Sequence, residues 1–450
     1  MIKKIPRNPW FIFLPFLCFY AYIVIINKWP TLYGDEIRYV RFGRSLLHGF
    51  YSPPPPHINL WNGPGYPLLL APFLALKAHA LTITLINALY LYVALVLLFK
   101  AIKLVSNHKI ALVLCLLLAI YPNTLSILPI LYTEAFTGLL VSAFIYTLTL
   151  SYTKSSSGYA VAAGLILGFL TLTKVIFGYV LVICLIGALT KALLTKKRMN
   201  YLRSARVLAI ALAVTLPYLF YTWHITGKVF YWGNSGGMSL YWMSTPYEHE
   251  FGDWKLPELN NNQYPILFKS KDVIAILKKN HQKEFNFILK HNEVEQDELF
   301  KQAAIRNIEQ NPLKFAQNYY YNFARMLFNF PYSYAYQDGA IVGNIIRGSL
   351  MLWATVISMV LTVLNWRRII YPLRFLLFIA GVYLALSGAL SAYPRQLDVI
   401  LPVLFFWMGF LAANLPGLKL KFMEEENLDA ISLHDLEEEL ADEQGAAKVY

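Results

Sequence analysis

The chain has 450 residues, of which 57% are hydrophobic and 14% are charged. Soluble domains carry about 25% charged residues, so this composition excludes an ordinary soluble domain and indicates a polytopic membrane protein. The formal net charge is +13, although ten acidic residues and one lysine lie between Glu424 and the end of the chain. The rest of the chain is therefore strongly basic, which suits contact with anionic lipids and does not argue for a nucleic-acid partner.

Ten hydrophobic segments are predicted to form membrane-spanning helices, so the predicted fold class is all-α. The segments cover residues 10–26, 81–99, 110–121, 129–150, 159–173, 175–194, 207–223, 341–364, 370–390 and 399–415. The third and fifth are shorter than the roughly 20 residues that a helix needs to cross a bilayer. We therefore expect these two to be tilted, supported by neighbouring spans or merged with the next span.

Basic residues cluster in the loops that lie on one side of a chain with ten spans. They are Lys3, Lys4, Arg7, Lys100, Lys103, Lys109, Lys196, Lys197, Arg198, Arg203, Arg206, Arg367, Arg368 and Arg374. The positive-inside rule makes this side cytoplasmic, with both termini there, and we expect the protein in the cell (inner) membrane. The predicted organisation is a transmembrane core over residues 1–224 with an outer loop at about 27–80, an extracytoplasmic helical region over 225–340, C-terminal spans over 341–415 and an acidic cytoplasmic tail over 416–450.

An acidic pair, Asp35 and Glu36, follows the first span. Ionisable groups at membrane depth are costly and tend to be functional, and a carboxylate there can act as a general base. The alternative is a charge that stabilises the start of a helix. Residues 37–49 read as an amphipathic interfacial helix whose Arg38 and Arg41 share a face. These arginines are expected to contact either lipid headgroups or a bound phosphate.

Beyond the acidic pair, the outer loops have two further features. Glycines and prolines at 62–72 predict a tight re-entrant turn that lines a cavity. Residues 272–289, 295–310 and 312–328 carry apolar residues at helical spacing, which predicts a small helical cap. The histidines of the outer loops lack the spacing of metal ligands, and each cysteine lies in an apolar span. No metal ligand is therefore assigned, and a divalent cofactor remains possible without support from any motif.

Several motifs occur in a fixed order along the chain. They are the Asp35–Glu36 pair, Asn62-Gly-Pro-Gly-Tyr-Pro-Leu-Leu-Leu-Ala-Pro, Tyr132-Thr-Glu-Ala-Phe, Ala163-Gly-Leu-Ile-Leu-Gly-Phe-Leu-Thr-Leu-Thr-Lys, Gly236-Gly-Met-Ser-Leu-Tyr, Asn307-Ile-Glu-Gln-Asn-Pro and Tyr393-Pro-Arg-Gln. This series resembles the GT-C superfamily of integral-membrane glycosyltransferases, in the branch of protein mannosyltransferases, lipid A aminoarabinose transferases and their bacterial relatives. The resemblance extends over nearly the whole chain, up to about residue 415.

The resemblance implies an inverting hexosyl- or pentosyltransferase that acts at the extracytoplasmic face. The donor would be a sugar on a polyprenyl phosphate, and the acceptor a hydroxyl or phosphate of a glycan, lipid or protein. Asp35 takes the position of the catalytic base, with Glu36 beside it. The aminoarabinose branch has a Glu-Lys pair before a double proline, whereas residues 62–65 here are Asn-Gly-Pro-Gly. That departure puts an aminoarabinose substrate and a metal site in doubt.

The leaving phosphate of such a donor needs fixed positive charge. Lys174 and Arg395 lie at predicted outer ends of spans and are candidates with Arg38 and Arg41, the alternative being contact with headgroups. Glu134 is expected either to hydrogen-bond the first outer loop or to touch the sugar or acceptor. Tyr66 is a candidate to stack on the sugar or isoprenoid, although interfacial aromatic residues are common in membrane proteins.

Two other classes of function compete with the glycosyltransferase. A transporter or flippase for lipid-linked or polar substrates predicts ionisable groups within the spans and an internal repeat. Here the acidic residues gather outside the spans, and no repeat is evident. A membrane scaffold that binds partners through the acidic tail leaves the Asp35–Glu36 pair without a role.

Overall fold

The computed structural model describes residues 8–32, 34–195, 198–255, 272–335 and 341–415. Within these ranges the regular elements are all helices, which confirms the predicted fold class. The acidic tail over 416–450 and the basic residues Lys3, Lys4, Arg7, Lys196 and Lys197 lie outside the described residues.

Among the described residues, seven helices are long and apolar enough to cross a membrane, counting α1 (Pro9–Ile12) with α2 (Leu14–Asn27). The other six are α5 (Ala80–Val105), α8 (Glu134–Thr153), α10 (Phe177–Leu194), α11 (Arg198–Thr226), α16 (Ile341–Leu364) and α17 (Tyr371–Gly388). Three shorter helices, α6 (His108–Ala119), α9 (Ser157–Thr173) and α19 (Leu401–Asn414), occupy the remaining predicted spans. Each predicted span thus corresponds to a helix, but three of them are too short to cross a bilayer alone.

The third predicted span continues past its break. Helix α6 ends at Ala119, and a proline then begins α7 (Pro122–Ile127). Proline is well placed in the first turn of a helix because it needs no hydrogen bond from its nitrogen there. Helices α6 and α7 together cover residues 108–127, a longer stretch than the third predicted span of 110–121.

Small residues let α9 pack closely on α11. A Cβ atom added at Gly168 would lie 2.6 Å from the Val214 Cβ atom and 2.8 Å from the carbonyl oxygen of Ala211. Contacts this short leave no room for a side chain. Close approach through small residues is a common way for membrane helices to associate.

We expect Gly168→Ala to destabilise the bundle by about 1–3 kcal/mol, as overpacking of a tight contact does. The measurement is thermal unfolding of the purified protein in detergent. Gly381→Ala is the matched control, because that helical glycine has no atom within 4 Å of an added Cβ. Equal unfolding temperatures for the two variants would contradict the close α9–α11 contact.

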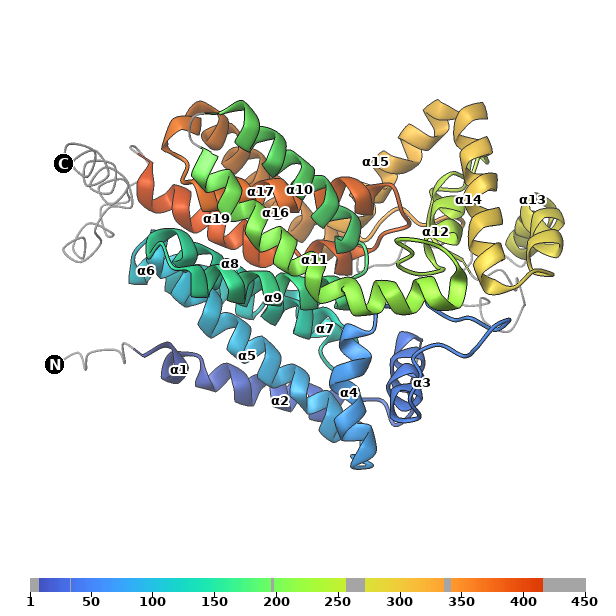
Figure 1. Ribbon diagram of the computed structural model, residues 1–450, viewed down its shortest axis with the longest axis horizontal. Helices are drawn as coiled ribbons and strands as arrows, with labels where there is room; N and C mark the ends of the chain where they lie inside the picture. Colours follow the sequence, from blue (N-terminus) through green and yellow to red (C-terminus); the bar gives the residue numbers. More distant parts are fainter. Residues whose placement is uncertain (1–7, 33, 196–197, 256–271, 336–340, 416–450) are drawn as a thin grey trace.

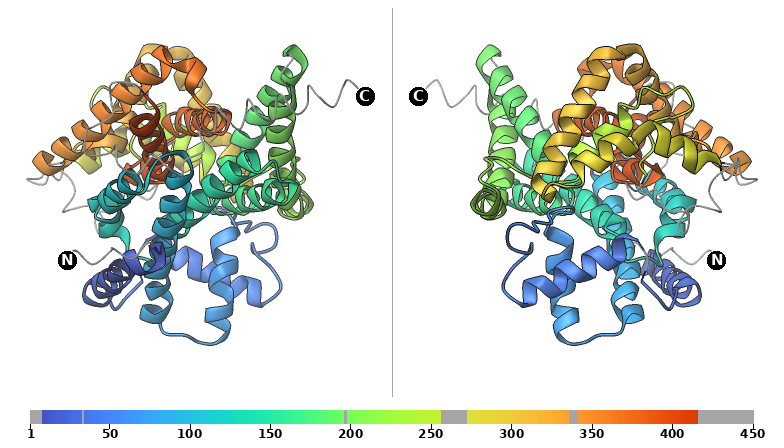
Figure 2. Two further views of the ribbon diagram at one scale, coloured as in Figure 1. Left: turned by 90° about the vertical axis from the view of Figure 1, so that its left-hand side faces the viewer. Right: turned by 90° about the vertical axis from the view of Figure 1, so that its right-hand side faces the viewer.

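Six further helices gather at one end of the bundle (Figures 1 and 2). They are α3 (Asp35–Leu47), α4 (Gly65–Ala75), α12 (Gly236–Met243), α13 (Asp272–Ile288), α14 (Glu293–Gln310) and α15 (Pro312–Phe328). The start of α1, α6 and the end of α19 lie at the opposite end, as Figure 1 shows. The predicted cap helices are present within a residue or two of their expected bounds.

The predicted re-entrant turn is only partly correct. Residues 62–64 form the turn, and α4 then runs from Gly65 to Ala75 with Pro72 inside it. The turn presses against the end of α9, since a Cβ atom at Gly63 would lie 2.1 Å from the Leu172 carbonyl oxygen. The glycines therefore allow a close contact, while the apolar residues after them form a helix.

Candidate active site

A cavity of about 310 Å³ lies where the helical bundle meets the outer helices. Its walls come from the start of α3, residues 61–63, the α9–α10 junction, the start of α12, Trp254, the end of α17, and α18 (Pro394–Asp398) with the loop before it. Segments far apart in sequence therefore meet at one point. Four predicted site residues line this cavity: Asp35, Arg38, Lys174 and Arg395.

Asp35 is the first residue of α3 and sits between two guanidinium groups. Arg395 Nη1 donates to Asp35 Oδ2 at 2.9 Å, and Arg38 donates to Asp35 Oδ1. The preceding Gly34 has φ +56°, a conformation that favours glycine, and it directs the chain into the helix. Burial alone would raise the pKa of Asp35, but the charges of Arg395, Arg38 and Lys174 outweigh it and hold this pKa below its usual value.

The cationic side chains of the cavity are each held in place. The Arg395 guanidinium lies 5.3 Å from the Tyr132 ring centre, and the Arg38 guanidinium lies 5.3 Å from that of Trp61. Burial opposes the charge of Arg395, but the carboxylates of Glu134 and Asp35 raise its pKa above the usual value. The arginine therefore stays charged at any physiological pH.

Lys174 follows the last residue of α9 and reaches Glu134, with Nζ 3.0 Å from Oε1. Glu134 is the first residue of α8 and lies behind Lys174, outside the cavity wall. The lysine thus faces the cavity while its partner carboxylate stays buried. The hydrogen bond of Glu134 thus runs to Lys174 and not to the first outer loop, and its predicted contact with that loop or with the substrate stays a prediction.

Polar atoms on the cavity wall lack a partner within the described residues. They are Arg38 Nε, Asn62 Oδ1 and Ser387 Oγ, and all three are buried. Buried polar groups in proteins are nearly always hydrogen-bonded. Because each of these three atoms is inaccessible to solvent, none of them is open to a molecule in the cavity.

Three predicted site residues lie elsewhere. Glu36 points away from the cavity, where its Oε1 accepts hydrogen bonds from Lys28 Nζ and from the backbone N–H of Leu131, the latter at 2.8 Å. Tyr66 is buried and packs edge-on against Tyr39, with ring centres 5.2 Å apart. Arg41 is exposed and does not line the cavity.

We expect Glu36→Gln to lower the free energy of unfolding by about 3–5 kcal/mol, because it leaves the Lys28 charge buried without its partner. The side chains of Lys28 and Glu36 are only 6% and 3% exposed. Glu298→Gln is the control, since the Lys228–Glu298 pair is half-exposed and such pairs contribute about 0–1 kcal/mol. Chemical unfolding in detergent measures both, and equal losses would contradict an anchoring role for Glu36.

Two tryptophans and several neutral polar side chains of the cavity were missed by sequence reasoning. Trp61 and Trp254 lie with ring centres 6.3 Å apart, and Ser387 and Ser391 belong to the segment before Arg395. Trp61 directly precedes the Asn62-Gly-Pro-Gly turn, which is the one signal that points to it. The chain has ten tryptophans, so residue type alone is not specific.

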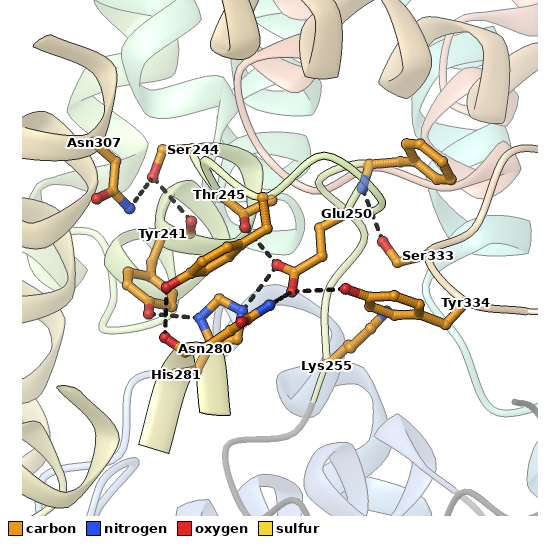
Figure 3. Close-up of polar contacts among 12 residues, drawn as sticks. Tyr241, Ser244, Thr245, Glu250, Lys255, Asn280, His281, Asn307, Ser333 and Tyr334 are labelled. Atoms are coloured by element: carbon orange, nitrogen blue, oxygen red, sulfur yellow. Dashed lines mark hydrogen bonds and ion pairs between the residues drawn. The ribbon is translucent and has the colours of Figure 1, made fainter. Parts of the chain in front are cut away.

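A second polar cluster lies within the outer helices (Figure 3). His281 Nε2 is 2.8 Å from Glu250 Oε2, His281 Nδ1 is 2.8 Å from the Tyr241 hydroxyl, and Asn280 donates to Glu250 at 2.9 Å. Burial alone would raise the pKa of Glu250, but the hydrogen bond and charge of His281 hold it below its usual value. Glu250 and His281 are almost wholly buried, so this cluster joins α12, α13 and the segment at Glu250.

The donor set around Asp35 does not suit a divalent cation. Two guanidiniums flank this carboxylate, and no group of three or more His, Cys, Asp or Glu side chains that could hold a metal occurs in the part of the chain that the structure describes. Hard divalent cations prefer several oxygen ligands. No reaction step is therefore derived through a metal.

Comparisons with known proteins give one family match. Residues 61–221 match the family model described as dolichyl-phosphate-mannose-protein mannosyltransferase. No curated protein matches the sequence.

The solved structures that the chain matches include three of an archaeal oligosaccharyltransferase, of which two are described here. One is the Archaeoglobus fulgidus enzyme tethered to an acceptor peptide, with 16% identity, TM-score 0.47, and coverage of 89% of this chain and 49% of that one. Another is AglB from the same organism with an inhibitory peptide and a dolichol-phosphate, with 16% identity, TM-score 0.47, and coverage of 89% and 50%. This chain spans about half the length of these proteins.

A further match is ArnT from Cupriavidus metallidurans bound to undecaprenyl phosphate, with 14% identity, TM-score 0.39, and coverage of 88% of this chain and 77% of that one. These structural likenesses are weak and carry no functional argument. The family match spans the turn after Trp61 and the second to seventh predicted spans. It confirms the resemblance of this chain to the GT-C superfamily of integral-membrane glycosyltransferases.

Proposed function

We propose that the cavity is the active site of an inverting glycosyltransferase that uses a polyprenyl-phosphate sugar. The observation that carries this proposal is one carboxylate, Asp35, that shares a cavity with the three cations Arg38, Lys174 and Arg395. A sugar transfer from a lipid phosphate needs a base for the acceptor and positive charge for the leaving phosphate. The cavity holds both kinds of group.

The reaction is a single displacement. Asp35 removes the proton of the acceptor hydroxyl, and the acceptor oxygen forms a bond to the anomeric carbon from the face opposite the phosphate. The bond between that carbon and the phosphate oxygen breaks, and its electron pair leaves with the polyprenyl phosphate. Arg395 and Arg38 are suited to bind the phosphate through charge-assisted hydrogen bonds, with Lys174 nearby as a point charge.

Both guanidiniums contact Asp35. A phosphate offers them a second anion, so donor binding loosens their hold on the carboxylate. Less positive charge at Asp35 raises its pKa and makes it a stronger base. The donor thereby activates the base that its own transfer requires.

This exchange predicts two different acid limits. The kcat/KM profile reports the free enzyme, where the pKa of Asp35 lies below its usual value, so kcat/KM should persist below the ordinary aspartate pKa of about 3.9. The kcat profile reports the donor complex, where the pKa is higher, so kcat should fall at a higher pH. Profiles with coincident acid limbs would rule out the exchange.

We place the cavity at the extracytoplasmic face. The outer helices lie at one end of the bundle, and α6 and the start of α1 lie at the opposite end (Figure 1). The basic loops at that opposite end are expected to face the cytoplasm. The proposed organisation is a core over residues 1–224 with its loop at about 27–80, the outer helical region over 225–340, the final spans over 341–415 and the tail over 416–450. The chain is a membrane protein, and the inner membrane is its proposed location.

The test is turnover by the purified protein with a panel of polyprenyl-phosphate hexoses and pentoses and with glycan, lipid and peptide acceptors. Release of polyprenyl phosphate together with a glycosylated acceptor would support the transferase. Movement of a labelled donor across vesicles without release of polyprenyl phosphate would support the transporter or flippase instead. Donor class and acceptor class are read from the same panel.

A further inference from the structure

Helix α15 carries a stripe of buried polar side chains. Asn318, Asn322 and Arg325 are spaced four and three residues apart, so they share one face of the helix, and each is 0% exposed. A buried polar or charged group is costly unless it is hydrogen-bonded. The groups that these three side chains bind therefore show which segments α15 holds in place.

Arg325 donates four hydrogen bonds, all to neutral oxygens. Its Nε donates to the Ala392 carbonyl at 2.9 Å, and its Nη1 donates to the carbonyls of Pro331 at 2.9 Å and Phe251 at 3.2 Å. Its Nη2 donates to Asn322 Oδ1 at 2.8 Å. The planar guanidinium thereby joins three loops that a lysine, with a single point of attachment, would not bridge.

Asn322 binds the same segment as Arg325. Its Nδ2 donates to the Gly388 carbonyl at 2.9 Å and to the Ser387 carbonyl at 3.3 Å. Its Oδ1 accepts the backbone N–H of Ala392 at 2.9 Å. The N–H and the carbonyl of Ala392 are both fixed by α15, and Ala392 itself lines the cavity.

Ala392, the residue that α15 fixes, influences where Arg395 lies. Tyr393 begins α18 with a capping box that includes Gln396, so the chain direction at Ala392 sets where the helix starts. Arg395 lies three residues after Ala392 and donates to Asp35 from this helix. A shift of the segment over 387–392 would move the guanidinium away from the carboxylate.

We propose that Arg325, together with Asn322, is a positioning residue that fixes the segment over 387–392 and thereby holds Arg395 against Asp35. The proposal rests on the proposed transferase function. Arg325 itself is buried behind the wall and does not line the cavity. Its effect on the reaction is therefore indirect.

The test compares Arg325→Lys and Asn322→Ala with Asn318→Ala. Asn318 is equally buried on the same helix, but it donates to the carbonyls of Met243 at 3.1 Å and Thr245 at 3.0 Å, at the end of α12. Each variant is assayed for unfolding temperature, kcat and KM for the donor, and the pH profile of kcat/KM. The hydrogen bonds of Asn318 do not reach residues 387–392, so this control removes a buried amide of the same helix without removing a direct bond to that segment.

We expect kcat to fall about 100-fold in Arg325→Lys and Asn322→Ala, since a displacement of about 1 Å in a reacting site has that scale of effect. We also expect the acid limb of kcat/KM to move to higher pH, because Asp35 loses the charge of Arg395. Asn318→Ala should lower the unfolding temperature while kcat and the acid limb stay in place. A limb shift in both test variants and not in the control supports the proposal.

A different pattern would overturn it. If kcat in all three variants falls only in proportion to lost stability and the acid limb does not move, α15 is structural and positions nothing for the reaction. If Arg325→Lys does not fold, Asn322→Ala decides by the same two readouts. A wild-type protein without turnover would instead overturn the proposed function, which separates the two failures.

Discussion

Asp35→Asn is expected to lower kcat by about 10²–10⁴-fold, the range that a positioned general base contributes. Asparagine keeps the shape of the side chain and still accepts a hydrogen bond from Arg395, but it cannot take a proton from the acceptor. The substitution also removes an anion that competes with the donor phosphate for Arg38 and Arg395. The donor KM should therefore stay the same or fall while kcat drops, which release of polyprenyl phosphate at varied donor concentration measures.

The kcat and KM split separates this prediction from a loss of folding. An unchanged unfolding temperature shows that the fold is retained. If kcat is unaffected, Asp35 is not the base and the proposed assignment is wrong. If kcat and donor affinity fall together, Asp35 organises the cavity and is not the proton acceptor.

Arg395→Gln is expected to lower kcat/KM by about 10²–10³-fold, the scale seen when one donor to a developing negative charge is removed. The guanidinium is positioned over Tyr132 and beside Asp35, so it meets a phosphate in this cavity already oriented. Glutamine keeps a hydrogen-bond donor but loses the charge. Binding of free polyprenyl phosphate should weaken in parallel, which a competition assay measures.

Arg44→Gln is the matched control for that experiment. Arg44 lies in the last turn of α3 and is exposed, so its loss should leave kcat/KM unchanged. A similar drop in both variants would show that general positive charge at the membrane surface, and not Arg395, draws the donor. An intermediate value for Arg395→Lys would separate the charge of the side chain from its fork geometry.

Local patterns were enough to predict much of the fold. Hydrophobic runs located the spanning helices, and apolar spacing located α13, α14 and α15. Span lengths were less certain because the ends of α6, α9 and α19 depend on neighbouring helices and turns. The Asn62-Gly-Pro-Gly segment was predicted as a turn only, since the sequence does not reveal that the glycines allow contact with the end of α9.

Only part of the candidate site could be predicted from the sequence, and the reason is geometric. Adjacent residues on a helix point in different directions, so Asp35 and Glu36 could not both face one cavity, and the sequence does not say which one does. Arg38 and Arg41 share a face of α3, but only Arg38 lines the cavity and contacts Trp61, because Arg41 lies about one turn further along the helix. Lys174 lies at the end of α9 and Arg395 lies in α18. The sequence does not show that the packing of distant segments brings these two helices to one cavity.

The polar stripe of α15 shows a different limit. Asn322 and Arg325 stand among tyrosines and phenylalanines, and an arginine on a helix is usually at the surface. Two of its partners are carbonyl oxygens more than 60 residues away in sequence, those of Phe251 and Ala392. Every residue has a backbone carbonyl, so no residue type in the sequence marks these partners. Only the structure reveals the contact.

The contact between Asp35 and Arg395 joins residues 360 positions apart in the chain. During synthesis, Asp35 emerges early, and its partner Arg395 is made only after the helices from α3 to α17 have been translated. A nascent chain that stalls before α18 can insert the preceding helices and still lack the contact between these two residues. We therefore expect the proposed site to be complete only once α18 has been made.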